Sequence, residues 1–512
     1  MKIWERIAPG RAARRAEARV RLARAQTAIL AESKRVELLQ TYDAAKMGGR
    51  NVGWHRPHTS AGTEIQTALP FLRSTARDLV RNSPHGSRAV RVLGSHIAGT
   101  GVRPRGQFGM VADSDTRAAL QRVTRDQWER FSENCDLSGQ LDFYGQQRLI
   151  ARAVAESGEA LRLWRPVEAN GLLRWRCEVI EGDLLDHQRN EARRDGSRIV
   201  QGVEFDAIGR RVAYWLHESH PGDRYSSGGL RWDIRRVPAE YVDHIYEVLR
   251  PGQVRGVSWF APVATTMRDV DDLAAAEVVR KKLEACISMV VHNDHDDNDT
   301  GGAVNPATDS QGQAILTSGG RPIEAMEPGM VLEARPGWGL DFHAPPASEG
   351  LVEHMKERLH AIAAGIGTTY FQMTGDLSEA NYSSMRAGEV EFARLVDVWQ
   401  ADLMVMQSGA PAWRRVMAAA GINGEIRSEI TPRASWTPPK RPWVDPLKDA
   451  RAAIDQMRAG ILAPQEVIAR TGRTPEELVE DLTEWRDMTE GLALDPDYSP
   501  EADMQGETDA ET

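Results

Sequence analysis

The chain has 512 residues, a net charge of −10 and three cysteines. A single hydrophobic core stops growing near about 250–300 residues, so this length predicts more than one domain. No run of about 18 apolar residues is present, which argues against a transmembrane helix. Cys135, Cys177 and Cys286 lie far apart without metal-ligand spacing, which favours a reducing compartment.

Charge is distributed unevenly along the chain. Residues 1–25 contain eight basic and two acidic residues, whereas the segment from Thr474 onward contains fourteen acidic residues and one basic residue, Arg486. A protein that grips DNA needs basic patches. A conduit through which DNA slides works better without many phosphate contacts. The balance fits a channel better than a repressor or nuclease, although it is also compatible with ordinary composition.

The first part of the chain predicts helices. Residues 1–40 are rich in Arg and Ala and read as a helical arm, and residues 41–68 read as a loop. Apolar spacing predicts helices over Leu69–Ile97, Asp115–Asn134 and Phe143–Glu156. The first of these restarts at Ser83 and Pro84, an N-cap followed by a first-turn proline.

The pattern then changes to alternation, which marks half-buried strands. Alternating segments cover 159–165, 173–180, 199–205 and 211–217, with further strands at 237–242 and 244–246. Helices followed by a mostly antiparallel sheet predict an α+β domain over residues 61–256.

The second half returns to long helices. A helix is predicted over Phe260–Val290, followed by a Gly- and Pro-rich module over 292–346 with short β-like pieces at 314–316 and 330–333. Two further helices, Glu349–Gly365 and Arg386–Gln407, enclose a long polar loop, which in a compact domain tends to be functional or disordered. A Pro- and Trp-rich linker, 435–446, leads to two or three short helices within 447–490 and an acidic tail, 491–512, predicted to be disordered.

Searches for catalytic and metal motifs are negative. His292–Asp299 resembles an EF-hand loop in its spacing, but the sixth position is Asp299 instead of Gly and the twelfth is Asn305 instead of Glu. No phosphate-binding GxxxxGK[ST] loop and no GxSxG elbow is present. We therefore expect no catalytic residue, no metal and no cofactor.

The polar loop Thr374–Gly388, with the sequence TGDLSEANYSSMRAG, resembles the signature loop of the lambda-type family of tailed-bacteriophage portal proteins. Other strings typical of that family occur in the family's order: RDLVRN at 77–82, AESGE at 155–159, RPGQVRG at 250–256 and VDP at 444–446. The resemblance covers roughly residues 65–485.

This resemblance implies a portal fold. Its parts would be a basic N-terminal arm (1–60), an α+β wing (61–256), a first stem helix (257–291), a clip (292–346), a second stem helix (347–366), a tunnel loop (367–385), a long wing helix and return (386–446) and a helical crown (447–490). The implied assembly is a ring, dodecameric in the family, at one capsid vertex of the virion. Its implied partners are double-stranded DNA, the terminase, the major capsid protein and head-completion or adaptor proteins, with assembly in the host cytoplasm.

The resemblance also implies which residues form the site. The narrowest point of the tunnel would be lined by Phe371, Gln372, Met373, Thr374, Gly375, Asp376, Leu377, Ser378, Asn381 and Tyr382. Asp376 and Ser378 can cap a turn, Asn381 tolerates left-handed backbone, and Tyr382 can anchor the loop by packing. We expect Phe371, Gln372 and Met373 to lie at the end of the stem helix. Charged residues of the first stem helix would line the channel: Asp269, Asp271, Asp272, Glu277, Lys281, Lys282 and Glu284.

Other interpretations stay open at this stage. The stem acids can instead form weak salt bridges between subunits. The chain as a whole can be a metal-dependent nuclease that uses the Asp/His run at 292–299, or a scaffold or adaptor without a pore.

Overall fold

The computed structural model describes residues 17, 18, 20–29, 50, 52, 53, 58–108, 111, 113–223, 234–286, 290–293, 338–341, 350–378, 381–426, 432–441 and 445–489. The chain divides into two compact units, Met1–Ser60 and Ala61–Thr512. In the first unit, residues 20–29 form an exposed helix, as the Arg/Ala-rich pattern predicts. The second unit contains all the elements described below.

Four helices open the second unit: α3 (Ala61–Asn82), α4 (Pro84–Ile97), α5 (Ser114–Glu133) and α6 (Phe143–Ser157). The predicted restart at Ser83 is confirmed, with Pro84 in the first turn of α4. The loop predicted up to residue 68 is wrong over its last part, because α3 begins at Ala61. Tertiary contacts fix this early turn: Ala61 is buried, and the Gln201 amide donates to the Gly62 carbonyl at 2.6 Å.

Two antiparallel sheets follow, which confirms the α+β class. In the first, β2 (Glu159–Ala169) lies between β3 (Leu172–Glu181) and β9 (Val242–Tyr246). The second sheet has its strands in chain order: β4 (Glu191–Ala192), β5 (Arg198–Val200), β6 (Val203–Phe205), β7 (Arg211–His217) and β8 (Ile234–Pro238). Short 3₁₀ turns cover Gly182–Leu184 and Ala239–Tyr241, the second of which interrupts the strand predicted over 237–242.

One strand prediction and part of one linker prediction are wrong. The segment 199–205 is a tight hairpin instead of one strand, because Gln201 (φ 51°) and Gly202 (φ 83°) adopt the left-handed backbone of a two-residue turn. Part of the predicted linker is β12 (Arg433–Thr437), which pairs with β1 (Arg103–Gln107). Neither of these strands alternates clearly in hydropathy, so only their long-range pairing reveals them.

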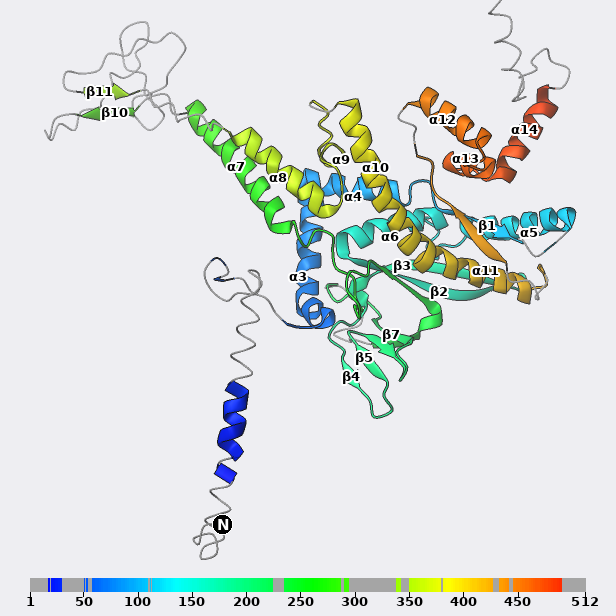
Figure 1. Cartoon of the computed structure of the whole chain (residues 1–512), viewed down its shortest axis with the longest axis horizontal. Helices are drawn as coiled ribbons and strands as arrows, with labels where there is room; N and C mark the ends of the chain where they lie inside the picture. Colours follow the sequence, from blue (N-terminus) through cyan, green and yellow to red (C-terminus); the bar gives the residue numbers. More distant parts are fainter. Residues whose placement is uncertain are drawn as a thin grey trace, which may run out of the picture. The chain divides into compact units, whose positions relative to one another are not determined.

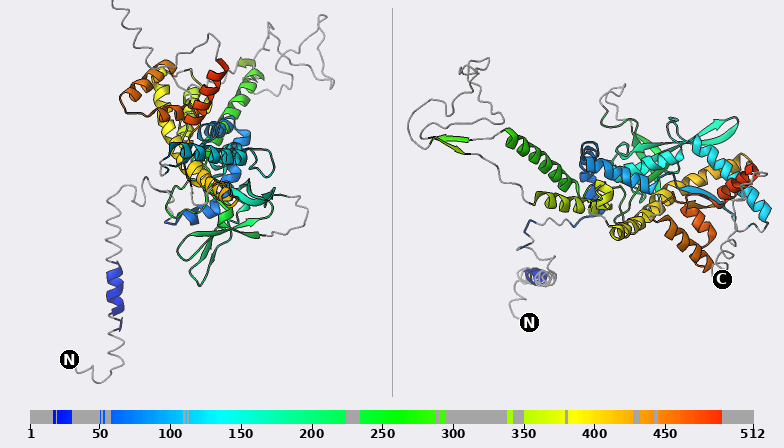
Figure 2. Two further views of the ribbon diagram at one scale, coloured as in Figure 1. Left: turned by 90° about the vertical axis from the view of Figure 1, so that its right-hand side faces the viewer. Right: turned by 90° about the horizontal axis from the view of Figure 1, so that it is seen from above.

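Long helices dominate the later part of the chain. They are α7 (Ala264–Cys286), α8 (Leu351–Ile366), the short α9 (Tyr370–Thr374), α10 (Tyr382–Trp399), a π-helical segment (Gln400–Gly409) and α11 (Ala410–Ile422). Figure 1 and Figure 2 show α7 and α8 side by side, and α10 continuing through the π-helical segment into α11. The third long helix is therefore longer at both ends than the predicted 386–407.

The predicted clip is described only in part. β10 (Val290–Asn293) pairs antiparallel with β11 (Trp338–Asp341), so the first stem helix ends before the predicted Val290. The β-like pieces at 314–316 and 330–333, and residues 294–299 of the Asp/His run, lie outside the described residues.

Three short helices form the predicted crown: α12 (Pro446–Arg458), α13 (Pro464–Arg470) and α14 (Pro475–Thr489). Each begins at a proline, which has no N–H to leave unpaired in a first turn. The acidic tail, 491–512, lies outside the described residues. Across the described chain, no helix is both long and apolar enough to cross a membrane.

A buried charged cluster joins the two sheets to α3. The Glu159 carboxylate accepts from the guanidinium groups of Arg73 (2.5 Å) and Arg255 (2.5 Å) and from the Gly256 N–H (2.7 Å). His244 Nε2 lies 3.0 Å from the same carboxylate. Burial would raise the pKa of Glu159, but the charges of Arg255 and Arg73 hold that pKa well below its usual range.

This cluster explains two of the sequence strings used as family marks. Glu159 ends AESGE, and Arg255 and Gly256 end RPGQVRG. The two strings touch closely, since a Cβ on Gly256 would lie 2.0 Å from the Gly158 carbonyl oxygen. The fold therefore accounts for the residues of both strings at this contact.

Candidate functional site in the stem and the signature loop

The stem is the helix pair α7 and α8. Met267 and Val270 of α7 are buried in the same core cluster as Leu359 and Ile362 of α8. The helices approach closely at Gly365, where a Cβ would lie 2.3 Å from Val263 Cγ1. Glycine at this point therefore lets the start of α7 pack directly on the end of α8.

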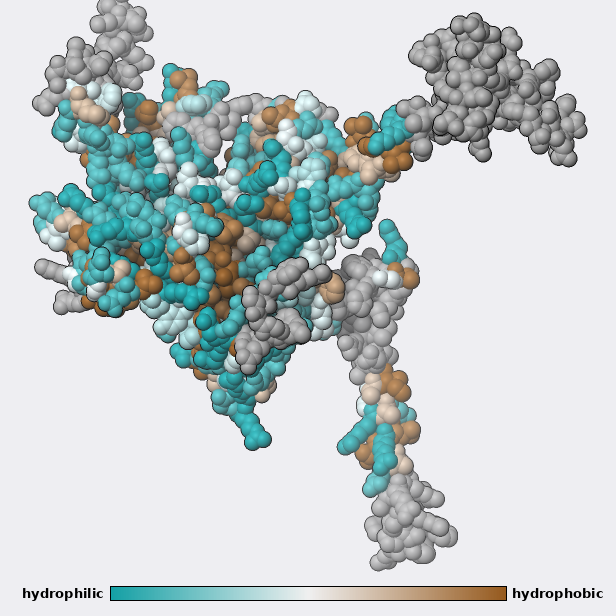
Figure 3. Space-filling view, turned by 180° about the vertical axis from the view of Figure 1, so that it is seen from behind, coloured by the Kyte–Doolittle hydropathy of each residue, from teal (hydrophilic) through white to brown (hydrophobic). Residues whose placement is uncertain are grey.

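The outer halves of both stem helices have no comparable core. None of the residues 271–282 and 351–358 is buried in the single chain. Val278, Val279 and Val352 are 52%, 54% and 74% exposed. Figure 3 shows apolar side chains gathered at this end of the helix pair. These halves therefore present apolar surface that the single chain does not cover.

The predicted channel-lining residues of α7 fall into two groups. Asp269, Asp272, Lys281 and Lys282 are exposed. Asp271 and Glu277 are half-buried: Ser83 Oγ lies 3.4 Å from Asp271 Oδ1, and Glu277 forms an ion pair with Arg280 at 2.6 Å. The side chain of Glu284 lies outside the described part of the chain. Asp272 lies 3.6 Å from Arg268 on the same helix, and the role of the exposed group in a channel stays a prediction.

The signature loop is more ordered by local hydrogen bonds than a fifteen-residue loop suggests. It begins at the end of α9, which is capped at its start by Thr369 and Gln372 and ends at Gly375 in left-handed backbone (φ 79°). Arg88 of α4 donates to the Gln372 carbonyl at 2.8 Å. The loop is thus fixed to the wing at its beginning.

Asp376 organises the tip of the loop. Its carboxylate accepts from the Ser378 N–H (3.0 Å), the Ser378 hydroxyl (2.7 Å) and the Tyr370 hydroxyl (3.0 Å). The hydrogen bonds from Ser378 lower the pKa of Asp376. Tyr370 in turn stacks on His360 of α8, with ring centroids 4.1 Å apart. The tip is therefore connected to the stem through Asp376 and Tyr370.

The predicted loop residues differ in their exposure. Gln372 and Met373 are buried, so their side chains belong to the core, and Phe371 lies in α9 instead of at the end of the stem helix. Gly375, Ser378 and Leu377 are exposed, Leu377 by 54%. Thr374 and Asp376 are half-buried.

Asn381 does not use the left-handed backbone that asparagine tolerates. Asn381 has extended backbone (φ −99°), and its side chain caps α10 by accepting from the Ser384 N–H at 2.8 Å. The Tyr382 side chain, expected to anchor the loop, lies outside the described part of the chain.

Sequence reasoning missed the residues that support the loop. Arg88, Tyr370 and His360 hold it, yet none stands in the signature string. Tyr370 alone had a detectable signal, because an aromatic residue six positions before an Asp–x–Ser turn can reach back to it. Arg88 is nearly 300 positions away in sequence, so its contact depends on the fold.

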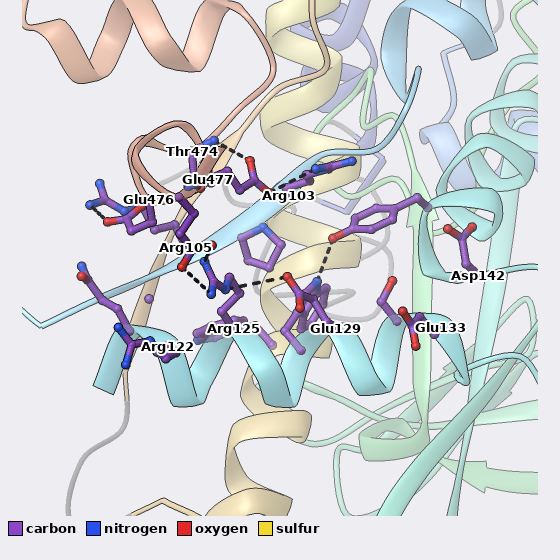
Figure 4. Close-up of a pocket in the computed structure, with 18 of the residues that line it drawn as sticks. Arg103, Arg105, Arg122, Arg125, Glu129, Glu133, Asp142, Thr474, Glu476 and Glu477 are labelled. Atoms are coloured by element: carbon purple, nitrogen blue, oxygen red, sulfur yellow. Dashed lines mark hydrogen bonds and ion pairs between the residues drawn. The ribbon is translucent and has the colours of Figure 1, made fainter. Parts of the chain in front are cut away.

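A second feature is the cavity between the predicted crown and the wing, of about 400 Å³. Figure 4 shows arginines of β1 and α5 facing glutamates of α14 across it. Arg103 pairs with Glu477 at 3.3 Å, Arg125 pairs with Glu480 at 2.9 Å, and Arg105 pairs with Glu476. Because opposite charges already neutralise one another here, we interpret the cavity as part of a polar contact between the predicted crown and the wing.

The structure also brings together Glu181, Asp183 and His220, a grouping that the sequence did not suggest. Arg77 lies 2.6 Å from Asp183 and 3.4 Å from Glu181, and Arg73 lies 3.7 Å from Asp183. These arginines already supply the positive charge that a metal ion would bring. We therefore assign no metal to this cluster.

Comparison with known proteins identifies the family to which this chain belongs. Residues 47–400 match the family described as phage portal protein, lambda family, so the chain belongs to the lambda family of phage portal proteins. It is 26% identical over 472 residues to the probable portal protein of Halomonas phage phiHAP-1, covering 88% of this chain and 87% of that protein. It is 23% identical to portal protein B of Escherichia phage lambda, covering 84% and 86%.

Among solved structures, the chain is similar to a chain in the neck of an empty GTA particle computed with C6 symmetry. The TM-score is 0.43 at 17% identity, covering 78% of this chain and 94% of that chain.

Proposed function

We propose that this portal protein assembles into a ring at one capsid vertex and forms the conduit for double-stranded DNA during packaging and ejection. The family pattern suggests twelve subunits. The stem helices would surround the channel, and the signature loop would form its narrowest point. The protein has a structural role without catalysis of its own.

The observation that carries this proposal is the uncovered outer stem. Valines that are more than half exposed on α7 and α8 remain in contact with water in the single chain. Exposed apolar patches of this kind mark protein–protein contacts. Neighbouring copies around a ring would cover both helices at once, because every subunit then has a neighbour on each side.

The loop tip supports the tunnel role. Leu377 and Ser378 are exposed, while the base of the loop is held by Arg88 and Tyr370. A tip that is exposed and yet fixed at its base suits a constriction that contacts a sliding duplex. Acids on the exposed side of α7 would keep phosphate contacts few.

Docking of partners is the less direct part of the proposal. The clip would face the terminase during packaging and the head-completion or adaptor proteins afterwards, whereas the major capsid protein would surround the wing. The assembled particle would carry the ring at its vertex after assembly in the host cytoplasm.

Negative-stain microscopy of the purified chain tests the proposal. A ring with a central hole is expected. Monomers or irregular aggregates at all concentrations would favour the scaffold or adaptor alternative. Mg²⁺-dependent cleavage of duplex DNA by the same preparation, abolished by Asp296→Ala in the Asp/His run, would favour the nuclease.

A further inference from the structure

The predicted crown has one helix with two different faces. Glu476, Glu477 and Glu480 of α14 form ion pairs with the wing. A helix turns by about 100° per residue, which places three apolar residues on the side of α14 away from these glutamates. We call them the α14 stripe: Val479 (61% exposed), Leu482 (39%) and Trp485 (43%).

This arrangement is the reverse of an ordinary surface helix. An amphipathic helix normally buries its apolar face and exposes its charged face. Here the charged face contacts the wing, and α14 has no buried residue at all. The α14 stripe is therefore a face that the described residues of its own subunit leave largely exposed.

The crown exposes a second apolar face on a different helix. We call it the α12 stripe: Leu447 (64% exposed), Ile454 (42%) and Ile461 (76%). Leu447 and Ile454 are seven positions apart and so share one side of α12, and Ile461 follows the end of the helix.

The charges around the two stripes are complementary. The sequence of α14 contains six acidic residues and one arginine. The sequence of α12 contains three basic and two acidic residues, and its Arg451 and Arg458 are exposed. Glu476, Glu477 and Glu480 are already paired with the wing, which leaves Asp481, Glu484 and Asp487 against Arg486 on the rest of α14. The remaining charge of α14 is therefore negative and that of α12 weakly positive, so contact between them is favourable, whereas α14 against another α14 is repulsive.

We propose that the α14 stripe of one subunit packs against the α12 stripe of the neighbouring subunit. A closed ring needs head-to-tail contacts, in which each subunit offers two unlike surfaces that fit each other. The two stripes meet this requirement within one small helical module. This inference rests on the proposed ring, and it assigns a specific contact within it.

Cysteine cross-linking of assembled full-length chains tests the contact. In a Cys286→Ser background, Leu482→Cys is combined with Ile454→Cys, and purified rings are treated with a flexible bis-maleimide. Cys135 and Cys177 are buried, so they serve as unreactive native thiols. The double variant is expected to give a ladder of covalent multimers on a denaturing gel, because each subunit links to the next.

The single variants are the matched controls. Leu482→Cys alone and Ile454→Cys alone should stay monomeric on the gel, because each stripe meets the other stripe and not itself. A ladder from Leu482→Cys alone would show that α14 packs on α14 and would overturn the proposal. If the double variant formed rings but gave no ladder, the proposed crown contact would be overturned, whereas the proposed ring would stand.

A second measurement is independent of cysteine geometry. Leu482→Gln together with Trp485→Gln should shift ring dissociation to a lower urea concentration. Ile208→Gln, at a 76% exposed hairpin tip outside the crown, should not. If rings of the Leu482→Gln, Trp485→Gln variant and rings of the Ile208→Gln variant dissociated at the same urea concentration, the proposal would be contradicted. Absence of rings from the unmodified chain would instead overturn the proposed function and the crown contact with it.

Discussion

Replacing His244 by glutamine should flatten the dependence of stability on pH. His244 is fully buried, and its Nε2 lies 3.0 Å from Glu159. Burial lowers the pKa of His244 to about 4, against the opposing attraction of Glu159. The native histidine is therefore neutral and donates through Nε2–H. Its Nδ1 has no partner, so a glutamine amide can replace the single hydrogen bond that is made.

The sign follows from proton binding. Between pH 6.5 and about 4 the unfolded chain binds a proton at this histidine and the native chain does not. Stability therefore falls as the pH falls through this window and is fully present above pH 6.5. The difference between the two pKa values corresponds to about 3.5 kcal/mol, at about 1.4 kcal/mol per pH unit. Glu159, whose pKa is lowered, adds a further loss of stability below about pH 4.5.

Urea unfolding of the wild type and His244→Gln at pH 7.5, 6.5, 5.5 and 4.5, at one fixed protein concentration, measures the effect. Between pH 6.5 and 4.5 the variant should lose about 2–3 kcal/mol less than the wild type. Tyr246→Phe is the matched control: it removes a hydroxyl that donates to the Gln253 carbonyl at 3.0 Å, so it should lower stability equally at every pH. Parallel curves for the wild type and His244→Gln would refute the reasoning.

Three further predictions concern the stem and the loop. Gly365→Ala should lower the free energy of unfolding by about 1–3 kcal/mol through overpacking against Val263, and adding Val263→Ala should largely restore it. Calorimetry of the single and double variants measures both effects, and a Gly365→Ala variant more stable than the wild type would contradict the prediction. Deleting Gly375–Ala380 should leave rings intact but reduce packaged DNA, measured as genome per particle, and wild-type packaging would count against the tunnel role. Rings should bind duplex DNA weakly, and their affinity should depend only slightly on salt concentration. The double variant Asp269→Asn, Asp272→Asn should increase this salt dependence. Tight binding of DNA by the unmodified ring would refute the prediction of an acidic channel.

The sequence predicted most of the helices but fewer of the strands. Apolar spacing located α4, α5, α6 and α8 to within a few residues, because each has one face against the core. It failed for the hairpin at Gln201 and Gly202, where alternation continues through a turn, and for β1 and β12, which pair across more than 300 residues. Strand pairing of this range depends on the whole fold, so no local pattern reports it.

For the candidate site, the sequence located the loop but did not reveal its support. The signature string includes Asp376 and Ser378, and their turn forms as predicted. The predicted tunnel residues also include Met373, which is buried, and omit Arg88 and His360, which hold the loop. The predicted site thus contains both core and exposed positions, and only burial separates them.

Burial also distinguishes two kinds of sequence string typical of the family in this chain. AESGE and RPGQVRG meet in the buried cluster at Glu159, where substitution should change stability first. The tip at Leu377 and Ser378 makes few contacts with its own core, so substitution there should change transport of DNA before it changes stability. Because the outer stem and the crown stripes are also uncovered in the single chain, assembly into a ring would supply the contacts that folding of one subunit leaves unmade. Mutations at these faces should therefore affect assembly before they affect folding of the subunit.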